Sequence, residues 1–426
     1  MDRHPTPIKF TELDLAEPLL KGVQAAGFTE CTPIQARTLP HALGGADVAG
    51  QAQTGTGKTA AFLLATFQRL LMRAPAQNRK PSQPRALVIA PTRELALQIG
   101  KDAEAIGKFS GQIIRVVYGG ESYERQRDKL REGVDVLIGT PGRLIDYHKQ
   151  RVFDLRAADV AVMDEADRMF DLGFIRDVRY LLRRLPPPEA RLTMLFSATL
   201  SYRVMELAYE HMNNPELIRI EPDKVTADRV RQIMYMPSAN EKIALLIGLL
   251  KRMDAHRTMV FVNTKRVAEQ LSAYLEGNHI HARVLSGDVP QRKRLRYLRQ
   301  FQEGELPVLV TTDVASRGLH VPDVSHVFNF DLPQDAEDYV HRIGRTARAG
   351  AEGDAISFAC EEYAYSLPDI EEFIGHAIPR ASVSEDLLAD VLPPAKQEKT
   401  KKPHPKNSRQ RAKGGRRKNP TRRSSR

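Results

Sequence analysis

Short apolar runs rich in β-branched residues recur along the chain, and polar residues and an amphipathic stretch follow each of them. The runs include 86–90, 134–138, 160–163 and 193–196 in the first half, and 258–262, 307–310 and 326–330 in the second. Strands of this length that alternate with helical stretches form parallel sheets built from βα units. The pattern therefore predicts an α/β fold.

A polar stretch interrupted by prolines, 213–228, divides these runs into two groups. A chain of 426 residues is long enough for two domains. We therefore predict two tandem parallel-sheet domains, 1–215 and 231–385, joined by a short linker, 216–230, and followed by a tail, 386–426. Because only the first domain has a phosphate-loop pattern, we expect the ligand in the cleft between the domains.

That phosphate-loop pattern is Ala-Gln-Thr-Gly-Thr-Gly-Lys-Thr, and it departs from G-x-x-x-x-G-K-[ST] only at its first residue. Its glycines let the backbone approach phosphates and direct N–H groups at them. Lys58 is expected to reach the β- and γ-phosphates, and the Thr59 hydroxyl to bind Mg²⁺. The apolar run 59–67 predicts a helix whose N-terminus faces the anion. A flexible glycine turn before a core helix is the alternative. The predicted nucleotide-binding residues of the loop are Ala52, Gln53, Thr54, Gly55, Thr56, Gly57, Lys58 and Thr59.

The buried-strand pattern at 160–163 ends in the acidic sequence Asp164-Glu165-Ala166-Asp167. Carboxylates at a strand end suit Mg²⁺, which prefers oxygen ligands. With the phosphate loop upstream, they predict a nucleoside triphosphatase that uses Mg²⁺. We assign Asp164 to the metal and Glu165 to the attacking water, because phosphoryl transfer needs positioning and charge neutralisation. Asp167 is expected to couple the site to other elements, with a simple helix N-cap as the alternative.

Positive charge is concentrated at the C-terminus. The whole chain has 64 Lys and Arg, 53 Asp and Glu and a net charge of +11, yet residues 1–395 are slightly acidic. The segment 396–426 has fourteen basic residues and one acid, and it lacks leucine, isoleucine, valine and aromatic residues. Such a segment cannot bury enough apolar surface to order itself, so we expect a disordered basic tail. Basic arms of this kind bind nucleic-acid phosphates, although a tail that only aids solubility is the alternative.

The remaining composition bears on location. Cys31 and Cys360 are the only cysteines, which fits a reducing cytosol and excludes a disulfide scaffold or zinc ribbon. No run of 18 apolar residues occurs, so no membrane insertion is expected. The N-terminus lacks the apolar stretch of a signal peptide. We therefore expect a cytoplasmic protein.

A series of further motifs in a fixed order resembles the DEAD-box ATP-dependent RNA helicases across residues 1–385. The motifs are GFTECTPIQ at 27–35, PTRELA at 91–96, GG at 119–120, TPGR at 140–143, SAT at 197–199, Q-x-x-R at 291–294, TDVASRG at 312–318 and HRIGRTAR at 341–348. The resemblance implies two RecA-like domains and an RNA-stimulated ATPase that locally unwinds short RNA duplexes. An ATP-gated RNA clamp or adaptor is the alternative from another class.

The resemblance also implies roles for individual residues. Phe10 and Gln35 would contact adenine, and the amide of Gln35 has the donors and acceptor that an adenine edge needs. Asp313 would contribute to the ATP site, and Arg345 and Arg348 would reach the γ-phosphate as arginine fingers. The expected coupling residues are Asp167, Ser197, Thr199, His341 and Arg342. The expected RNA contacts are Thr92, Arg93, Gly120, Thr140, Gly142, Arg143, Thr264, Lys265, Arg294 and Thr312.

Two positions depart from the family pattern, because His320 replaces the usual aspartate and Ala347 replaces the usual glycine. The local sequence around His320, with 166–174, 201–204 and 360–364, resembles the family's branch found in the bacterial RNA degradosome. That branch implies RNase E as a partner of a monomeric helicase core, and the segment 363–379 could be a docking surface or a helix packed on its own sheet. A ribosome-assembly helicase of the same family is the alternative.

Overall fold

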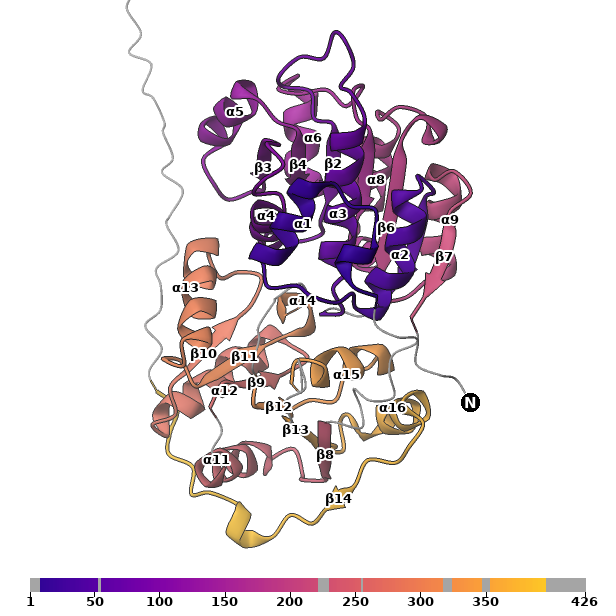
Figure 1. Cartoon of the computed structure of the whole chain (residues 1–426). Helices are drawn as coiled ribbons and strands as arrows, with labels where there is room; N and C mark the ends of the chain where they lie inside the picture. Colours follow the sequence, from indigo (N-terminus) through magenta and orange to yellow (C-terminus); the bar gives the residue numbers. More distant parts are fainter. Residues whose placement is uncertain are drawn as a thin grey trace, which may run out of the picture.

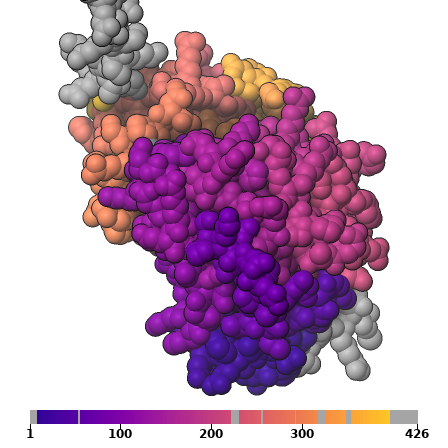
Figure 2. Space-filling model, turned by 90° about the horizontal axis from the view of Figure 1, so that it is seen from above, coloured from indigo at the N-terminus to yellow at the C-terminus, as the bar shows by residue number. Residues whose placement is uncertain are grey.

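The computed structural model describes residues 8–52, 55–220, 230–253, 256–316, 324–346 and 353–395. Within these ranges it contains two seven-stranded sheets, and every strand pairing in both is parallel. The first domain lies above the second in Figure 1. Seen from above, the orange and yellow second domain projects beyond one edge of the first (Figure 2). The predicted fold class is confirmed.

The first sheet has the strand order β3-β4-β2-β5-β6-β1-β7. Its strands are β1 Val48–Gln51, β2 Ala86–Ile89, β3 Ile114–Val117, β4 Val136–Gly139, β5 Val160–Met163, β6 Leu192–Ser197 and β7 Glu216–Arg219. Its helices are α1 Glu17–Ala25, α2 Pro33–Leu43, α3 Lys58–Met72, α4 Arg93–Ile106, α5 Tyr123–Glu132, α6 Pro141–Lys149, α7 Ala166–Asp171, α8 Ile175–Leu182 and α9 Tyr202–His211, with 3₁₀ turns η1 Phe10–Glu12 and η2 Pro188–Ala190. Helices α1 to α4 cover one face and α5 to α9 the other, which is why the central strands are apolar at every position.

The second sheet repeats this arrangement in the order β10-β11-β9-β12-β13-β8-β14. Its strands are β8 Val230–Tyr235, β9 Thr258–Phe261, β10 Ala282–Leu285, β11 Val308–Thr311, β12 His326–Asn329, β13 Gly353–Phe358 and β14 Arg380–Ala381. Its helices are α11 Lys242–Arg252, α12 Lys265–Gly277, α13 Gln291–Gln302, α14 Asp313–Ser316, α15 Ala336–Ile343 and α16 Leu367–Ile374, with turns η4 Ala364–Ser366 and η5 Glu385–Leu387. Helices α11 and α12 pack on one face, and α13, α15 and α16 on the other.

Two predicted boundaries differ from the structure. Residues 216–219, predicted as linker, form the edge strand β7 and pair with β1. This strand was overlooked because three of its four residues are exposed, as is common at a sheet edge. Residues 221–229 of the predicted linker lie outside the described residues.

The second boundary concerns residues 386–395, predicted as the start of the tail, which instead lie along α11 and α12. Ala389 N donates to Ala244 O at 3.1 Å, and Ala395 N donates to Ala273 O at 2.9 Å. A Cβ on Gly248 would lie 1.9 Å from Leu387 O, so the missing side chain permits this contact. We call residues 383–395 the C-terminal strap. The basic segment 396–426 lies outside the described residues.

Helix α16 packs on its own sheet. Leu367, Ile370 and Ile378 are buried in the core of the second domain, whereas Phe373 remains 54% exposed. Of the two possibilities for this segment, the structure therefore favours the packed helix. None of the helices in the described residues is both long and apolar enough to cross a membrane.

Candidate nucleotide site at the domain interface

The phosphate-loop segment connects β1 to α3 at the carboxyl ends of the first sheet's strands. Gly55 and Gly57 have φ angles of 88° and 93°, in the left-handed region that favours glycine. Helix α3 begins at Lys58, which is only 5% exposed and whose Nζ donates to Ala52 O at 2.8 Å. Gln53 and Thr54 lie outside the described residues. The helix N-terminus and the lysine therefore meet at one point, as an anion site requires.

A cavity of about 570 Å³ adjoins this loop, within the range of small-molecule sites. It is lined by residues of the loop, of α2 and α4, and of the acidic strand end, including Phe28, Thr32, Gln35, Gly55, Gly57, Lys58, Thr59, Gln98, Asp164 and Glu165. The structure thus brings together most of the predicted nucleotide-binding residues that it describes.

The two predicted adenine contacts are placed differently. Gln35 is 4% exposed, and its side-chain amide bonds to the backbone of two segments. Oε1 accepts from Thr32 N at 2.9 Å, and Nε2 donates to Gly57 O at 3.0 Å. Phe10 is 2% exposed and packs in the core, with its ring centroid 6.4 Å from that of Phe28. Phe28 is 40% exposed and lines the cavity, so here Phe28 is the aromatic side chain at the cavity wall.

The acidic end of β5 lines the same cavity as the loop. Asp164 is 2% exposed, and burial raises the pKa of its carboxyl to about 6, an effect that the Lys58 ammonium opposes and the Glu165 carboxylate reinforces. Glu165 has a φ of 52°, and its Oε2 lies 3.4 Å from Nη1 of Arg168. The raised pKa means that the ionised carboxylate is poorly stabilised by its surroundings. A bound cation or a proton would stabilise it.

Asp167 ties this strand end to β6. Its Oδ2 accepts from Ala198 N at 2.9 Å and from Thr199 N at 3.1 Å, while its own N donates to Ser197 Oγ at 3.1 Å. The coupling residues predicted in the first domain therefore form one connected group. The alternative, that Asp167 is a helix N-cap, is wrong, because Glu165 is the N-cap residue of α7 and Asp167 lies within its first turn.

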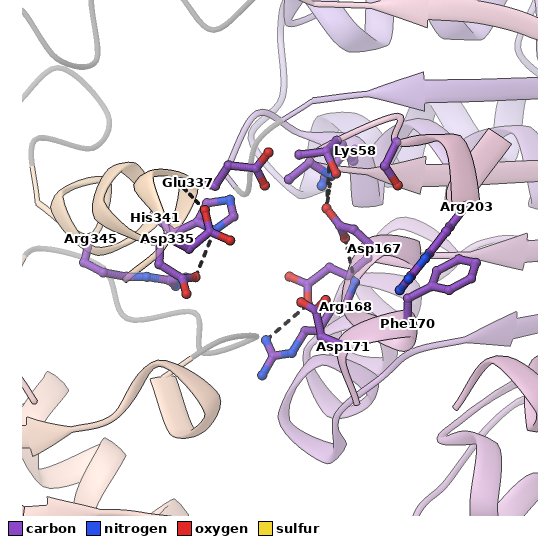
Figure 3. Close-up of a pocket in the computed structure, with 15 residues that line it drawn as sticks. Lys58, Asp167, Arg168, Phe170, Asp171, Arg203, Asp335, Glu337, His341 and Arg345 are labelled. Carbon is purple, nitrogen blue, oxygen red and sulfur yellow. Dashed lines mark hydrogen bonds and ion pairs between the residues drawn. The ribbon is translucent and has the colours of Figure 1, made fainter. Parts of the chain in front are cut away.

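A second cavity, of about 330 Å³, lies between the domains. The first domain contributes Lys58, Glu165, Asp167, Arg168, Phe170, Asp171, Ala198, Thr199, Ser201 and Arg203, and the second contributes Asp335, Glu337, Asp338, His341 and Arg345. Figure 3 shows the labelled side chains of α7 and α15 on opposite sides of this cavity. Arg345 is 4% exposed, and His341 Nδ1 lies 3.9 Å from Asp338 Oδ1. Arg348, the second predicted finger, lies outside the described residues, as does His320.

Arg342 and Asp313, predicted in different roles, bind each other. The Arg342 guanidinium donates to both Asp313 carboxylate oxygens, at 2.6 and 2.7 Å, and Arg342 is 1% exposed. Bidentate pairs of this kind fix geometry as well as adding energy. In this structure the Asp313 carboxylate is therefore engaged within the second domain.

Direct contacts join the two domains. Arg294 Nε lies 2.7 Å from Glu94 Oε1, and both side chains are about one-tenth exposed. Burial lowers the pKa of Arg294, and the carboxylate of Glu94 opposes that shift. Arg168 Nη2 donates to Val314 O at 3.2 Å. The predicted RNA contact Arg294 is thus part of the domain interface here. Glu94 and Arg168 were missed as site residues, although Arg168 follows Glu165 at a helical spacing that brings side chains together.

Many of the other predicted RNA contacts sit where strands end and helices begin. Thr92 and Thr264 occupy equivalent places after β2 and β9, and each Oγ1 accepts a hydrogen bond of 3.3 Å from the third residue of its helix. Thr140 precedes α6, Gly142 lies in its first turn with no atom within 4 Å of a built Cβ, and Thr312 precedes α14.

The side chains around this edge pack on one another. The Arg93 guanidinium lies so close to Gly120, whose φ is 87°, that a Cβ there would be 2.3 Å from Nη1. Arg143 donates to the Tyr147 hydroxyl at 3.2 Å and lies over the Tyr123 ring. Lys265 forms an ion pair with Asp288. Hydroxyls, small residues and cations are thus gathered at the carboxyl ends of both sheets.

Comparisons with known proteins agree with this geometry. Residues 32–207 match the family model "DEAD/DEAH box helicase", and residues 241–350 match "Helicase conserved C-terminal domain". A curated relative from Xanthomonas axonopodis pv. citri is 60% identical over 391 residues, which cover 92% of this chain and 68% of the relative. One from Psychromonas ingrahamii is 54% identical over 406 residues, covering 95% of this chain and 97% of the relative. Both are named ATP-dependent RNA helicase RhlB.

Solved structures lead to the same class. Saccharomyces cerevisiae Dbp5 bound to RNA and ADP BeF3 has a TM-score of 0.78 and 32% identity, and the match covers 88% of this chain and 95% of Dbp5. Mss116p bound to ssRNA and AMP-PNP has a TM-score of 0.78 and 29% identity, with coverage of 91% and 82%. The chain therefore belongs to the DEAD-box family and is an ATP-hydrolysing RNA helicase. Within that family it is similar to the RhlB helicases.

Proposed function

We propose that this helicase hydrolyses ATP in the cleft between its two domains, and that RNA bound across both domains promotes the closed arrangement. The observation that carries the proposal is the cavity lined by Lys58 and Glu165 from the first domain and by Arg345 from the second. Because the cationic group comes from the opposite domain, hydrolysis depends on how the two domains are placed. The domain division behind this proposal is 1–220 for the first domain and 230–395 for the second, with the basic tail beyond.

Each residue near the loop has a proposed task. Lys58 and the backbone of the loop bind the β- and γ-phosphates, and Gln35, which donates to Gly57 O, holds the loop beside the larger cavity, where we place adenine. Thr59 and Asp164 would hold Mg²⁺, which neutralises phosphate charge when bound. Within the described residues no cluster of three His, Cys, Asp or Glu side chains could hold a metal alone. This fits Mg²⁺, which usually keeps waters and shares its ligands with nucleotide phosphates.

Glu165 is the residue that we propose to orient the attacking water. Its carboxylate lines both cavities, and its ion pair with Arg168 holds it at the domain interface. Arg345 would stabilise the charge that develops on the transferred phosphoryl group. Asp167, Ser197 and Thr199 would transmit domain closure to the acidic strand end through their mutual hydrogen bonds.

RNA is proposed to lie across the carboxyl ends of both sheets. The hydroxyls of Thr92, Thr140, Thr264 and Thr312 and the backbone near Gly120 suit phosphates and 2′-OH groups, which carry no base sequence. The basic segment 396–426 would add a salt-sensitive attraction for RNA. Local unwinding of short duplexes follows if the closed domains hold one strand in a shape that the duplex cannot adopt.

The cellular setting is proposed from the relatives. The relatives are named ATP-dependent RNA helicase RhlB, and the degradosome branch that the sequence resembles implies a role in RNA degradation in the bacterial cytoplasm, with RNase E and the degradosome as partners. Co-purification from a bacterial lysate after RNase treatment tests this proposal. Recovery of RNase E would support it, and recovery of ribosomal particles alone would contradict it.

The variant Glu165→Gln tests the catalytic proposal and separates an enzyme from a passive clamp. We expect RNA-stimulated ATP turnover to fall by at least about 100-fold, since water would lose its orienting carboxylate, while ATP-dependent RNA binding persists. The matched control is Glu17→Gln, which removes an exposed carboxylate on α1 that pairs with Lys21. Turnover close to that of the parent in Glu165→Gln would contradict the role of Glu165.

A further inference from the structure

The second domain carries a counterpart of the phosphate-loop lysine. Lys242 begins α11 as Lys58 begins α3, and the connection from β8 to Lys242 has the same length as that from β1 to Lys58. Strands β8 and β1 also occupy the same place in their sheets. Asp331 stands at the second position after β12, as Glu165 does after β5. The two domains therefore place a lysine and a carboxylate at equivalent points.

In the second domain these two groups are in contact. Lys242 Nζ lies 2.5 Å from Asp331 Oδ1, and the two side chains are 5% and 2% exposed. The ammonium lies 4.2 Å from the centroid of the Phe330 ring and 5.3 Å from that of Tyr363. Phe330 occupies the position that Asp164 holds in the first domain. An ion pair and aromatic rings therefore fill the place that corresponds to the nucleotide site.

Two further hydrogen bonds of Asp331 lead towards α15. Its Oδ2 accepts from Asn263 N at 2.9 Å, and its carbonyl oxygen accepts from Arg342 Nη1 at 2.6 Å. Asn263 Oδ1 in turn accepts from Arg342 Nη2 at 2.9 Å. Arg345 N donates to Arg342 O at 3.0 Å, which links the finger residue to this group. We call Lys242, Asp331, Asn263 and Arg342 the buried polar network.

A gain in folding stability does not by itself explain why the domain contains a buried ion pair. Burying two charges costs as much as their attraction returns, and well-packed apolar residues often serve as well. A buried pair does fix positions, because its geometry and its hydrogen bonds must all be satisfied together. Besides the Asp331 N–H, which donates to Phe261 O at the end of β9, the bonds of Asp331 beyond the pair lead to Asn263 and Arg342, and therefore to the end of α15.

We propose that the Lys242–Asp331 ion pair is a positioning element for the arginine finger, and that it holds the end of α15 so that Arg345 reaches the interdomain cavity. This rests on the proposed role of Arg345. The same lysine-and-carboxylate arrangement thus serves ligand binding in the first domain and placement of a catalytic group in the second.

The double variant Lys242→Met/Asp331→Asn tests the proposal, because it leaves no buried charge unpaired. A displacement of about 1 Å at a reacting group can cost on the order of 100-fold in rate, so we expect RNA-saturated kcat to fall about 10- to 100-fold. KM for ATP should stay within about twofold, since the first domain sets it. Amide hydrogen exchange should become faster in α14 and α15, while β8 to β13 keep their protection.

The matched control is Arg231→Met/Asp354→Asn, which removes an ion pair of 2.6 Å from the same sheet. Arg231 is 71% exposed, and neither residue belongs to the buried polar network. This control should keep kcat. A double variant of the buried pair that keeps both kcat and α15 protection would overturn the proposal, as would a uniform loss of protection across the domain, which marks a merely stabilising pair.

If the double variant does not fold, Asn263→Ala gives the answer. It leaves the ion pair intact and removes the side-chain bonds of Asn263 to Arg342 and to Leu332 O, so the proposal predicts the same loss of kcat with unchanged KM. Normal kcat would overturn it. Arg345→Ala separates this inference from the proposed function. If Arg345→Ala keeps full RNA-stimulated kcat, the finger role of Arg345 is wrong. If Arg345→Ala loses kcat while Asn263→Ala keeps it, only the positioning role is wrong.

Discussion

The two domains share a strand order and the length of the loop that follows their equivalent strands β1 and β8, yet they use these features differently. In the first domain Lys58 and Asp164 line a cavity, and burial raises the pKa of Asp164 to about 6. In the second, Lys242 and Asp331 form a buried ion pair beside aromatic rings. In the first domain the lysine and the carboxylates face a cavity and can bind a ligand. In the second domain the lysine and the aspartate neutralise each other and fix the neighbouring backbone.

Arg345→Ala is expected to have the largest effect, because it removes the arginine that the second domain contributes to the cavity. A finger is worth about 10³- to 10⁵-fold in rate, and we expect RNA-stimulated kcat to fall within that range with little change in ATP affinity. The measurement is steady-state ATP hydrolysis at saturating RNA. Arg176→Ala, an exposed change on α8, is the control, and a loss below about tenfold would contradict the assignment.

Lys58→Met is expected to lower RNA-stimulated kcat/KM by about 10²- to 10³-fold, since one preorganised cationic donor to the phosphates is lost. The fold should be kept, because Asp164 can take up a proton when its neighbouring ammonium is removed. Activity assays and thermal unfolding check both parts. Unfolding of the first domain in this variant would show that Lys58 is a structural residue like its counterpart.

Lys242→Met, unlike Lys58→Met, should lower the stability of the fold in addition to its effect on kcat. Removing one partner of a buried ion pair leaves an uncompensated charge and costs about 3–5 kcal/mol of unfolding free energy. Denaturant unfolding of Lys242→Met beside Lys58→Met measures this difference. Equal stability of the two variants would remove the contrast between the domains.

The raised pKa of Asp164 predicts a pH dependence. If the ionised carboxylate is needed for catalysis, kcat/KM for ATP at saturating RNA should decrease as the pH falls through about 6. The effect of this group on folding stability changes with pH in the opposite direction to its effect on activity. Since the folded state holds this proton more tightly than the unfolded chain, the group favours folding below pH 3.8, and this contribution is lost as the pH rises to about 6. A pH profile that stays flat down to about pH 5 would contradict the assignment.

Gly248→Ala is expected to have the smallest effect and tests a feature of the second domain. The corresponding residue of α3 is Leu64, which is fully buried, whereas Gly248 lies against the C-terminal strap. Alanine normally stabilises a helix by about 1 kcal/mol over glycine. Here the Cβ would meet Leu387 O, so thermal unfolding should show a loss instead. In a chain that ends at residue 382 the same change should stabilise, and stabilisation of the full chain would contradict strap docking.

The sequence predicted the central strands well because they are apolar on both faces. Strand β5 was predicted with the bounds that the structure gives, and β2 and β9 within one residue. Edge strand β7 was missed because its exposed residues resemble a linker. The strap was missed because its backbone hydrogen bonds and close approaches to glycines cannot be read from residue types, although Leu387, Leu388 and Ala389 also pack against the core of the second domain.

Several motif residues that the sequence singled out line the two cavities, because their spacing reflects one loop and one strand end. Contacts between distant segments were not found. The pairing of Arg294 with Glu94 joins two motifs that were both expected to face RNA. The ion pair of Lys242 with Asp331 joins residues that no local sequence pattern relates. The equal lengths of the loops after β1 and β8 suggest the equivalence of Lys242 and Lys58 only once the strands are known.

The central claim is that hydrolysis needs groups from both domains at one cavity. The most direct measurement compares ATP turnover of residues 1–220 alone with that of the full chain saturated with single-stranded RNA. We predict that the first domain binds ATP but turns it over only at a low rate that RNA does not stimulate. Turnover by the first domain alone at the rate of the RNA-saturated full chain would contradict the account.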